Sequence, residues 1–524
     1  TLEGGSFEHA RETADVNLPV GDRVAVRVNG MLERSASFRD HFRLRREGVN
    51  PTATILAGGT VVHLGYERFN DTRTVDRGVP SFAGAPAPTS ADAFFGDPDQ
   101  NRARARVDAA DLSLEHAFGP LSLRYTTRGA RYDKFYQNVY PGAVTSDGAN
   151  VELRAYNHAT ARNNLFNQAD LTGTLVTGPL SHTLLVGGEL SRQSTDDFRE
   201  TGYFGDGTAT SLTVPLAAPA AATGVTFRQS ATDADNHTRL DIGAGYVQDQ
   251  VAFGKHWQAI AGIRLDRFAL RFHNNRENTD LARVDQIVSP RGGVIFKPVE
   301  QASLYASYSV SHLPGSGDQF ASLTPTTETL EPERFVNREL GAKWDVTTAL
   351  SLTAALYRLD RSNSQTTDPN DPSRVVQTGA QRTTGWELGA SGDVTDRWQI
   401  AGGWASQRAR ILSATRSGAQ GATVPLVPQN SISLWNKVQL TPIVGVGVGA
   451  VHQSRMYAAL DNTVTLPAFT RYDAGLYISL PAHSRLQVNM ENVLGASYFA
   501  TSHGNNNIMP GAPRTLRVSV SVGK

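Results

Sequence analysis

Basic and aromatic side chains recur at even positions in the segment that begins at Leu121. The row consists of Arg124, Arg128, Tyr132, Lys134 and Tyr136, and Tyr140 follows in the next predicted loop. Guanidinium groups bind anions, and aromatic rings stack or form cation–π contacts, so such a row suits a negatively charged ligand with aromatic rings. The alternative is a polar wall whose cations are neutralised by Asp and Glu of neighbouring strands. The sequence leaves both interpretations open.

Catalytic, metal and cofactor chemistry find little support in the sequence. The chain has no Cys, which excludes a disulfide framework, a Cys zinc site and a Cys nucleophile. Its 13 His lack metalloprotease spacing. The acidic segment 368–372 lacks EF-hand spacing, and the Gly-rich segment 445–450 lies in an alternating strand pattern with no helix after it. We therefore expect no enzyme, no protein-held metal and no bound cofactor.

The elements that position these side chains are β-strands, because alternation with a period of two dominates the chain. At the C-terminal end, Leu516, Val518 and Val520 alternate with Arg517 and Ser519. One face of each strand is apolar and the other is small or polar, which is typical of a wall between lipid and a polar lumen. The even row after Leu121 is opposite in parity to its apolar neighbours, so we expect it to face the lumen.

The connections between strands also alternate, between short turns and long polar loops. Short turns occur at 21–22, 119–120, 178–179, 254–256, 395–396 and 481–483. Long loops are predicted at 70–103, 137–150, 199–236, 312–333 and 411–428. This pattern predicts an all-β fold: a single transmembrane antiparallel β-barrel of 22 strands over residues 1–524, with short periplasmic turns and long extracellular loops.

Composition agrees with such a barrel and excludes other classes. Fifty basic residues balance fifty acidic ones, so we expect no nucleic-acid partner. No run approaches the roughly 18–20 apolar residues of a membrane helix, a test that does not apply to β-barrels. Trp257, Trp344 and Trp398 all fall next to short turns, which predicts an aromatic girdle at the periplasmic interface. Ordinary strand aromatics are the alternative.

Several segments, in order along the whole chain, resemble TonB-dependent outer-membrane receptors. They are 246–250 (YVQDQ), 331–344, 381–388 (QRTTGWEL), 488–499 and 505–514. The segment 311–320 (SHLPGSGDQF) is similar to the catecholate-siderophore branch of that family and adds His312 and Gln319, at a loop after a strand, to the candidate ligand site. With the lumen row, the predicted substrate-binding residues are Arg128, Tyr132, Tyr136, His312 and Gln319.

The resemblance implies a multi-pass receptor in the Gram-negative outer membrane that takes up a ferric siderophore, most simply a catecholate. Iron would be carried by the siderophore, and energy would come from TonB through an N-terminal plug, a domain that we expect to be absent from residues 1–524. We also expect a monomer surrounded by outer-membrane lipid and lipopolysaccharide. The alternatives are a passive porin, which would have about 16–18 strands, or a receptor for cobalamin, haem or a hydroxamate siderophore. An outer-membrane enzyme is a further alternative without a recognisable nucleophile.

Overall fold

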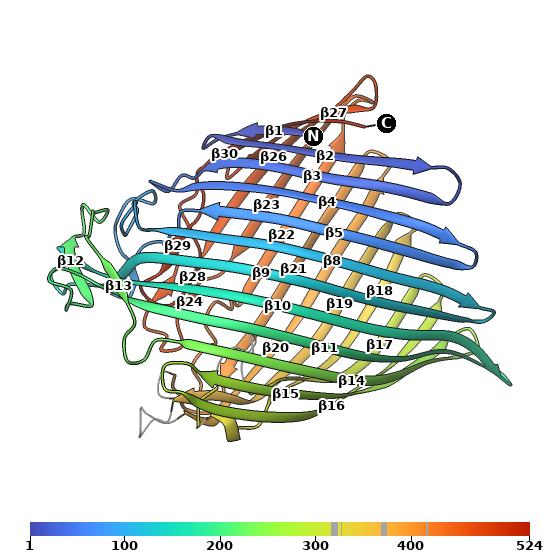
Figure 1. Ribbon diagram of the computed structural model, residues 1–524. Helices are drawn as coiled ribbons and strands as arrows, with labels where there is room; N and C mark the ends of the chain where they lie inside the picture. The colour runs from blue at the N-terminus through green and yellow to red at the C-terminus, as the bar shows by residue number, and fades with distance from the viewer. Residues whose placement is uncertain (316–322, 326, 368–374, 416–417, 524) are drawn as a thin grey trace.

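The chain folds into a closed antiparallel β-barrel (Figure 1). The computed structural model describes residues 1–315, 323–325, 327–367, 375–415 and 418–523. Within these residues the main sheet has 24 strands. Two of them, β12 and β13, belong to a loop, and the other 22 form the barrel wall. Each wall strand pairs with its neighbours in chain order, and β1 pairs with the last strand, β30, which closes the barrel as predicted.

The wall strands and the smaller elements have the following bounds. The wall strands are β1 (Leu2–Gly5), β2 (His9–Val20), β3 (Val24–Ala36), β4 (Arg43–Ala57), β5 (Thr60–Arg73), β8 (Arg102–Phe118), β9 (Leu121–Val144), β10 (Asn150–Thr177), β11 (Leu180–Tyr203), β14 (Asp235–Phe253), β15 (Trp257–Asn274), β16 (Thr279–Val299), β17 (Ala302–Leu313), β18 (Glu333–Thr347), β19 (Leu350–Thr367), β20 (Val375–Thr395), β21 (Trp398–Ile411), β22 (Asn430–Gln439), β23 (Val444–Gln453), β26 (Phe469–Leu480), β27 (Ser484–Glu491) and β30 (Thr515–Val522). The loops hold β6 (Ser81–Phe82), β7 (Ala85–Pro86), β12 (Ser211–Pro215), β13 (Thr226–Arg228), β24 (Met456–Tyr457), β25 (Thr465–Leu466), β28 (Phe499–Ser502), β29 (Ile508–Pro510) and the 3₁₀ helix η1 (Thr327–Thr329). No helix among the described residues is long and apolar enough to cross a membrane.

The connections divide the barrel into a turn end and a loop end, which lie at the right and left of Figure 1. Tight turns such as those at Gly119 and Gly178 have positive φ angles of 62° and 59°, a conformation that glycine adopts without strain. The loops predicted at 70–103, 199–236, 312–333 and 411–428 are present between the strands listed above.

The predicted loop at 137–150 is wrong in its extent. Strands β9 and β10 continue in register to Val144 and Asn150, which leaves only 145–149 as the connection. At 24 and 28 residues, β9 and β10 are much longer than the roughly 9–11 residues that cross a membrane. Their upper halves therefore project beyond the membrane, where pairing with neighbouring strands keeps the backbone groups hydrogen-bonded.

The outer face of the barrel is apolar, as the alternation predicts. On β30, Leu516, Val520 and Val522 are exposed, and Val518 pairs with Val488 of β27 and Gly4 of β1. Trp257 and Trp398 begin β15 and β21, and Trp344 lies near the end of β18. All three are exposed at the turn end, in agreement with the predicted girdle.

The main buried apolar core lies in the loops rather than in the barrel. Its buried members come from several loops and from the tops of β9 and β10: Val79, Phe95, Val139, Val151, Leu153, Ala155, Phe204, Val214, Val225, Met456, Ala458, Val464, Leu466 and Ile508. Segments far apart in the sequence join there, since Val79 and Ile508 form a two-way backbone bridge. This core fixes the loop 74–101 above the lumen.

Candidate functional site

The lower part of the predicted basic row lies in a neutralised wall. The Arg128 guanidinium lies 3.2 Å from Glu67 on β5, and Arg124 lies 3.3 Å from Glu115 on β8. Glu115 comes from the strand next to β9, and Glu67 comes from β5, the strand beyond β8, so the cations are neutralised from other strands as the second interpretation of the row expects. Arg128 is eight residues below Tyr136, about 27 Å along an extended strand. The structure therefore does not bring Arg128 into the same site as Tyr136.

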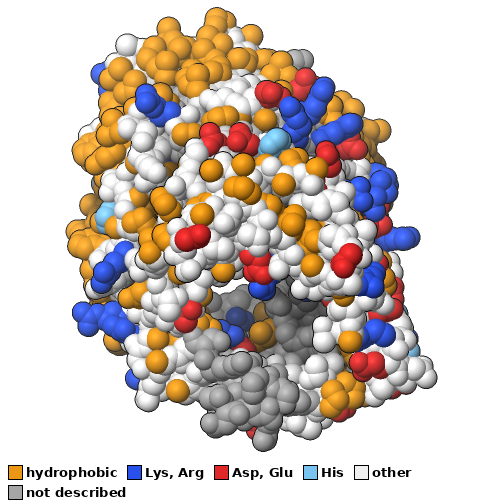
Figure 2. Space-filling model, turned by 90° about the vertical axis from the view of Figure 1, so that its left-hand side faces the viewer, with side chains coloured by type: hydrophobic (Ala, Val, Ile, Leu, Met, Phe, Trp, Pro, Cys, Tyr) orange, Lys and Arg blue, Asp and Glu red, His pale blue; other side chains and the backbone are white. Residues whose placement is uncertain are grey.

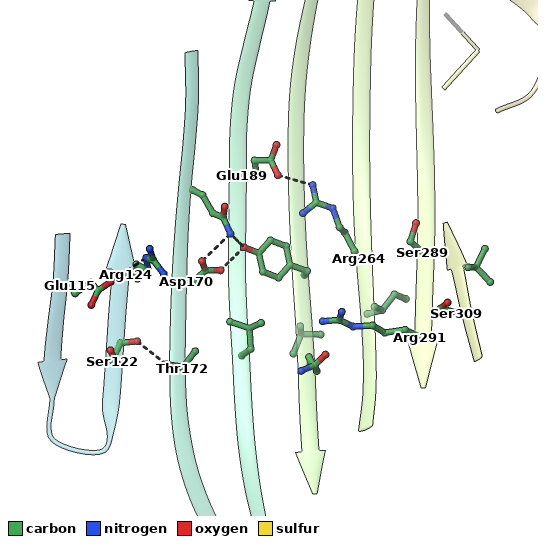
Figure 3. A pocket seen from close by; sticks show the side chains of 17 residues that line it. Glu115, Ser122, Arg124, Asp170, Thr172, Glu189, Arg264, Ser289, Arg291 and Ser309 are labelled. Atoms are coloured by element: carbon green, nitrogen blue, oxygen red, sulfur yellow. Dashed lines mark hydrogen bonds and ion pairs between the residues drawn. The ribbon is translucent and has the colours of Figure 1, made fainter. Parts of the chain in front are cut away.

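A hollow of about 800 Å³ in the lumen wall shows the same balance of charges (Figure 3). Arg264 pairs with Glu189 at 2.9 Å and with Asp266 at 2.8 Å. The Tyr246 hydroxyl donates to Asp170, and the Gln168 amide donates to both. This part of the wall is polar but nearly neutral, so it offers little selective attraction for an anion.

The upper part of the row differs, because three tyrosine rings meet there. Tyr136 and Tyr140 lie on β9 and Tyr156 lies on β10. The Tyr156 ring centroid is 5.8 Å from that of Tyr136 and 5.7 Å from that of Tyr140, the latter pair edge to face. Tyr132 comes four residues before Tyr136 on β9 and pairs with Arg162 of β10. Tyr136 therefore belongs to an aromatic cluster that the sequence indicated only in part.

Two arginines complete this cluster, which we call the mouth cluster: Arg77, Tyr136, Tyr140, Tyr156 and Arg199. Arg77 comes from the loop 74–101, and its Cζ lies 5.2 Å from the Tyr136 ring centroid, while its Nη2 donates to the Tyr156 hydroxyl. Arg199 of β11 lies over the Tyr156 ring at 4.3 Å. Such contacts hold guanidinium groups close to the rings while leaving N–H groups for a ligand.

The charges of the mouth cluster are not balanced. Arg199 pairs with Asp233 at 3.2 Å. The neighbouring Asp76 is engaged by Arg39 at 2.6 Å, with both side chains almost fully buried. No carboxylate among the described residues pairs with Arg77, and its buried Nε has no hydrogen-bond partner there. A half-buried cation without a counterion is a favourable place for an anionic ligand.

Two of these tyrosines, Tyr136 and Tyr140, remain neutral donors. Burial raises the pKa of Tyr136 far above its usual value, and burial followed by the nearby Tyr156 raises the pKa of Tyr140. Both residues lie in the upper part of β9, outside the segment that crosses the membrane. Their hydroxyl groups can therefore donate hydrogen bonds to an oxyanion across the physiological pH range.

The remaining predicted site residues lie elsewhere. His312 is next to the end of β17, where its Nδ1 is 3.4 Å from the Ser289 hydroxyl. β17 is on a different part of the wall from β9. Gln319 lies outside the described residues. No group of three or more His, Cys, Asp or Glu in the described part of the chain could hold a metal ion.

Sequence reasoning missed Arg77, Tyr156 and Arg199. Tyr156 and Arg199 have the lumen parity of their strands and are near the register partners of Tyr136 and Tyr140, so pairing β9 with β10 and β11 would have found them. Arg77 comes from a loop whose position depends on the loop core, and no local pattern marks it.

Figure 2, which looks onto the loop end, shows a hollow that leads inward between the loops.

A closed 22-strand barrel with apolar outer rows, long loops and a polar lumen defines an outer-membrane receptor or transporter rather than a 16–18-strand porin. Residues 48–493 match the family described as "TonB dependent receptor-like, beta-barrel". The chain belongs to this family and therefore to the outer membrane, and its relatives are receptors rather than enzymes.

Three named relatives are 26–29% identical to this chain over the aligned residues. The probable TonB-dependent siderophore receptor PiuA of Acinetobacter baumannii is 26% identical over 97% of this chain and 74% of the relative. The probable TonB-dependent receptor BfrD of Bordetella pertussis is 29% identical over 98% and 75%. The catecholate siderophore receptor Fiu of Escherichia coli O6:H1 is 27% identical over 99% and 75%.

Solved structures confirm the fold. The crystal structure of PiuA superposes with a TM-score of 0.92 at 24% identity, covering 99% of this chain and 80% of that one. The closed form of the ferric-catecholate import receptor Fiu from E. coli K12 gives a TM-score of 0.85 at 25% identity, with the same coverage. This chain is thus similar over nearly its whole length to the barrels of siderophore receptors.

Proposed function

We propose that this barrel takes up a ferric catecholate siderophore through the outer membrane, with energy from the TonB system. The observation that carries the proposal is the mouth cluster, in which Arg77 has no carboxylate partner among the described residues and lies against Tyr136 and Tyr156. The names of Fiu and PiuA, a catecholate receptor and a siderophore receptor, support it.

The chemistry of the ligand matches the cluster. A ferric catecholate carries net negative charge on oxygen atoms and presents flat aromatic rings. Arg77 and Arg199 can attract the charge and donate hydrogen bonds, and the tyrosine rings can stack on the catechol rings. Each charged hydrogen bond contributes roughly 1.5–3 kcal/mol when partly desolvated. A neutral hydroxamate complex would gain much less from Arg77.

Iron then needs no ligands from the protein, because the siderophore holds it. TonB acts on receptors of this family through a plug inside the barrel. We propose that this receptor uses such a plug, which would contact the neutralised wall around Arg264 and Glu189 and complete the ligand pocket from below. His312 and Gln319 remain proposed contacts for a second side of the ligand.

Binding to the purified barrel tests this proposal. Intrinsic fluorescence would be titrated with ferric tris-catecholate, with a ferric hydroxamate and with cobalamin. We expect the catecholate to bind most tightly, and Arg77→Gln to weaken it about 10- to 100-fold through loss of one charged donor pair. Arg124→Gln removes the same charge from the neutralised wall and serves as the matched control. Tighter binding of the hydroxamate, or equal effects of the two substitutions, would refute the proposal.

A further inference from the structure

The outer face of strands β18 to β21 carries an arginine cluster that siderophore uptake does not explain. Even-numbered residues of these strands face outward, as the exposed Leu340, Leu356 and Leu388 show. Arg338, Arg358, Thr384 and Arg408 lie directly opposite one another across the four strands, and Arg382 lies one step above Thr384.

One carboxylate holds three of these arginines together. Asp360 accepts Arg338 and Arg358 on Oδ2, each at 2.9 Å, and Arg382 on Oδ1 at 2.6 Å. Among the described residues of the outward rows of β18–β21, Asp360 is the only Asp or Glu. Arg408 is exposed and adds a fourth cation. The four arginines and the single aspartate therefore leave this outer surface with a net positive charge, and the ion pairs to Asp360 hold three of the arginines in place.

The cluster lies at the height of the lipid headgroups. Arg358 is eight residues from Leu350 at the start of β19, and Arg408 is ten residues from Trp398 at the start of β21. Since about 9–11 strand residues cross the membrane, both guanidinium groups reach the outer boundary of the hydrocarbon layer. Arg338 also lies 5.6 Å from the ring centroid of Tyr308. Such aromatic residues mark a membrane interface.

We propose that this surface binds a phosphorylated lipid of the outer leaflet. The phosphate groups accept hydrogen bonds from Arg338, Arg358, Arg382 and Arg408, since planar guanidinium groups bind phosphate in a fork. The acyl chains lie along the exposed Leu340, Leu356 and Leu388 directly below. A soluble anion would use only the upper half of this arrangement, whereas an acylated phosphate, as in the lipid A part of lipopolysaccharide, uses both.

Native mass spectrometry of the detergent-solubilised chain tests the proposal, with bisphosphorylated lipid A as the probe. The triple variant Arg338→Gln, Arg358→Gln, Arg382→Gln should bind lipid A at least tenfold more weakly, because each basic residue near a membrane surface contributes to the attraction. The corresponding Arg→Lys triple should recover part of the binding. Excess inorganic phosphate should leave the lipid A complex largely intact.

A matched control removes the same charge from the turn end, by Arg23→Gln, Arg397→Gln and Arg485→Gln. This variant should bind lipid A as the unmodified chain does. Heat-modifiable migration in gels checks that each variant is a folded barrel, and the single change Arg358→Gln replaces the triple if it fails to fold. Unchanged lipid A binding by the cluster variant, an equal loss in the control, or full competition by inorganic phosphate would overturn the proposal.

Discussion

A charge placed on the closing strand tests the assignment of faces. Val518 lies mid-strand on β30, between Val488 of β27 and Gly4 of β1, in the row that faces lipid. Val518→Arg should destabilise the barrel by about 2–4 kcal/mol, the cost of an arginine near the midplane of a membrane barrel. Ser519→Arg, one residue further, points into the lumen beside Glu3 and Gln487 and should cost less than about 1 kcal/mol.

Urea unfolding in phosphatidylcholine vesicles, followed by tryptophan fluorescence, measures both values. Because the chain contains no Cys, single cysteines at positions 517 and 518 can also be labelled with a lipid-soluble maleimide. Position 518 should react and position 517 should not. A one-residue shift in register exchanges the two faces. A larger cost at Ser519 than at Val518, or equal labelling at the two positions, would refute the assignment.

Three further results are expected. Arg39→Met leaves the buried Asp76 without its partner, which should destabilise the loop 74–101 by roughly 3–5 kcal/mol. This change should displace Arg77 and weaken catecholate binding. The barrel itself should still unfold at the same urea concentration. Catecholate affinity should not change through tyrosine ionisation between about pH 6 and 9, because the raised pKa values keep Tyr136 and Tyr140 protonated. A pH-dependent change in affinity that disappears in Tyr136→Phe would contradict this. In a planar bilayer this chain should conduct as a wide, weakly selective pore, because its fifty basic and fifty acidic residues balance; a silent inserted barrel would show that a loop fills the lumen.

The barrel could be predicted from the sequence because its physics is local and repetitive. Alternation fixes which side chains face lipid, as in 516–520, and the turns around Gly119 and Gly178 fix where strands reverse. The ends of the strands on the loop side of the barrel were harder to predict from the sequence. Strands β9 and β10 pair with each other and extend above the membrane. Because the segment 137–150 is polar, its sequence resembles a loop rather than a pair of strands.

The sequence indicated only those members of the mouth cluster that lie on the barrel strand β9. Tyr136 followed from lumen parity, and its neighbours on β10 and β11 required the strand register. Arg77 depends on the bridge between Val79 and Ile508, residues more than 400 positions apart in the chain, and on the buried pair of Arg39 and Asp76. Contacts at that separation leave no pattern in a single sequence. The division of the basic row into a neutralised lower part and an unbalanced upper part also depends on carboxylates from other strands.

Uptake of iron by cells tests the central proposal most directly. Cells that lack their own catecholate receptors would produce this barrel joined to the plug proposed above, and accumulation of ⁵⁵Fe supplied as a ferric catecholate would be measured with and without TonB. We expect accumulation that requires TonB and falls at least tenfold with Arg77→Gln, while Arg124→Gln retains it. Accumulation that persists without TonB, or that is the same in the Arg77→Gln and unmodified receptors, would contradict it.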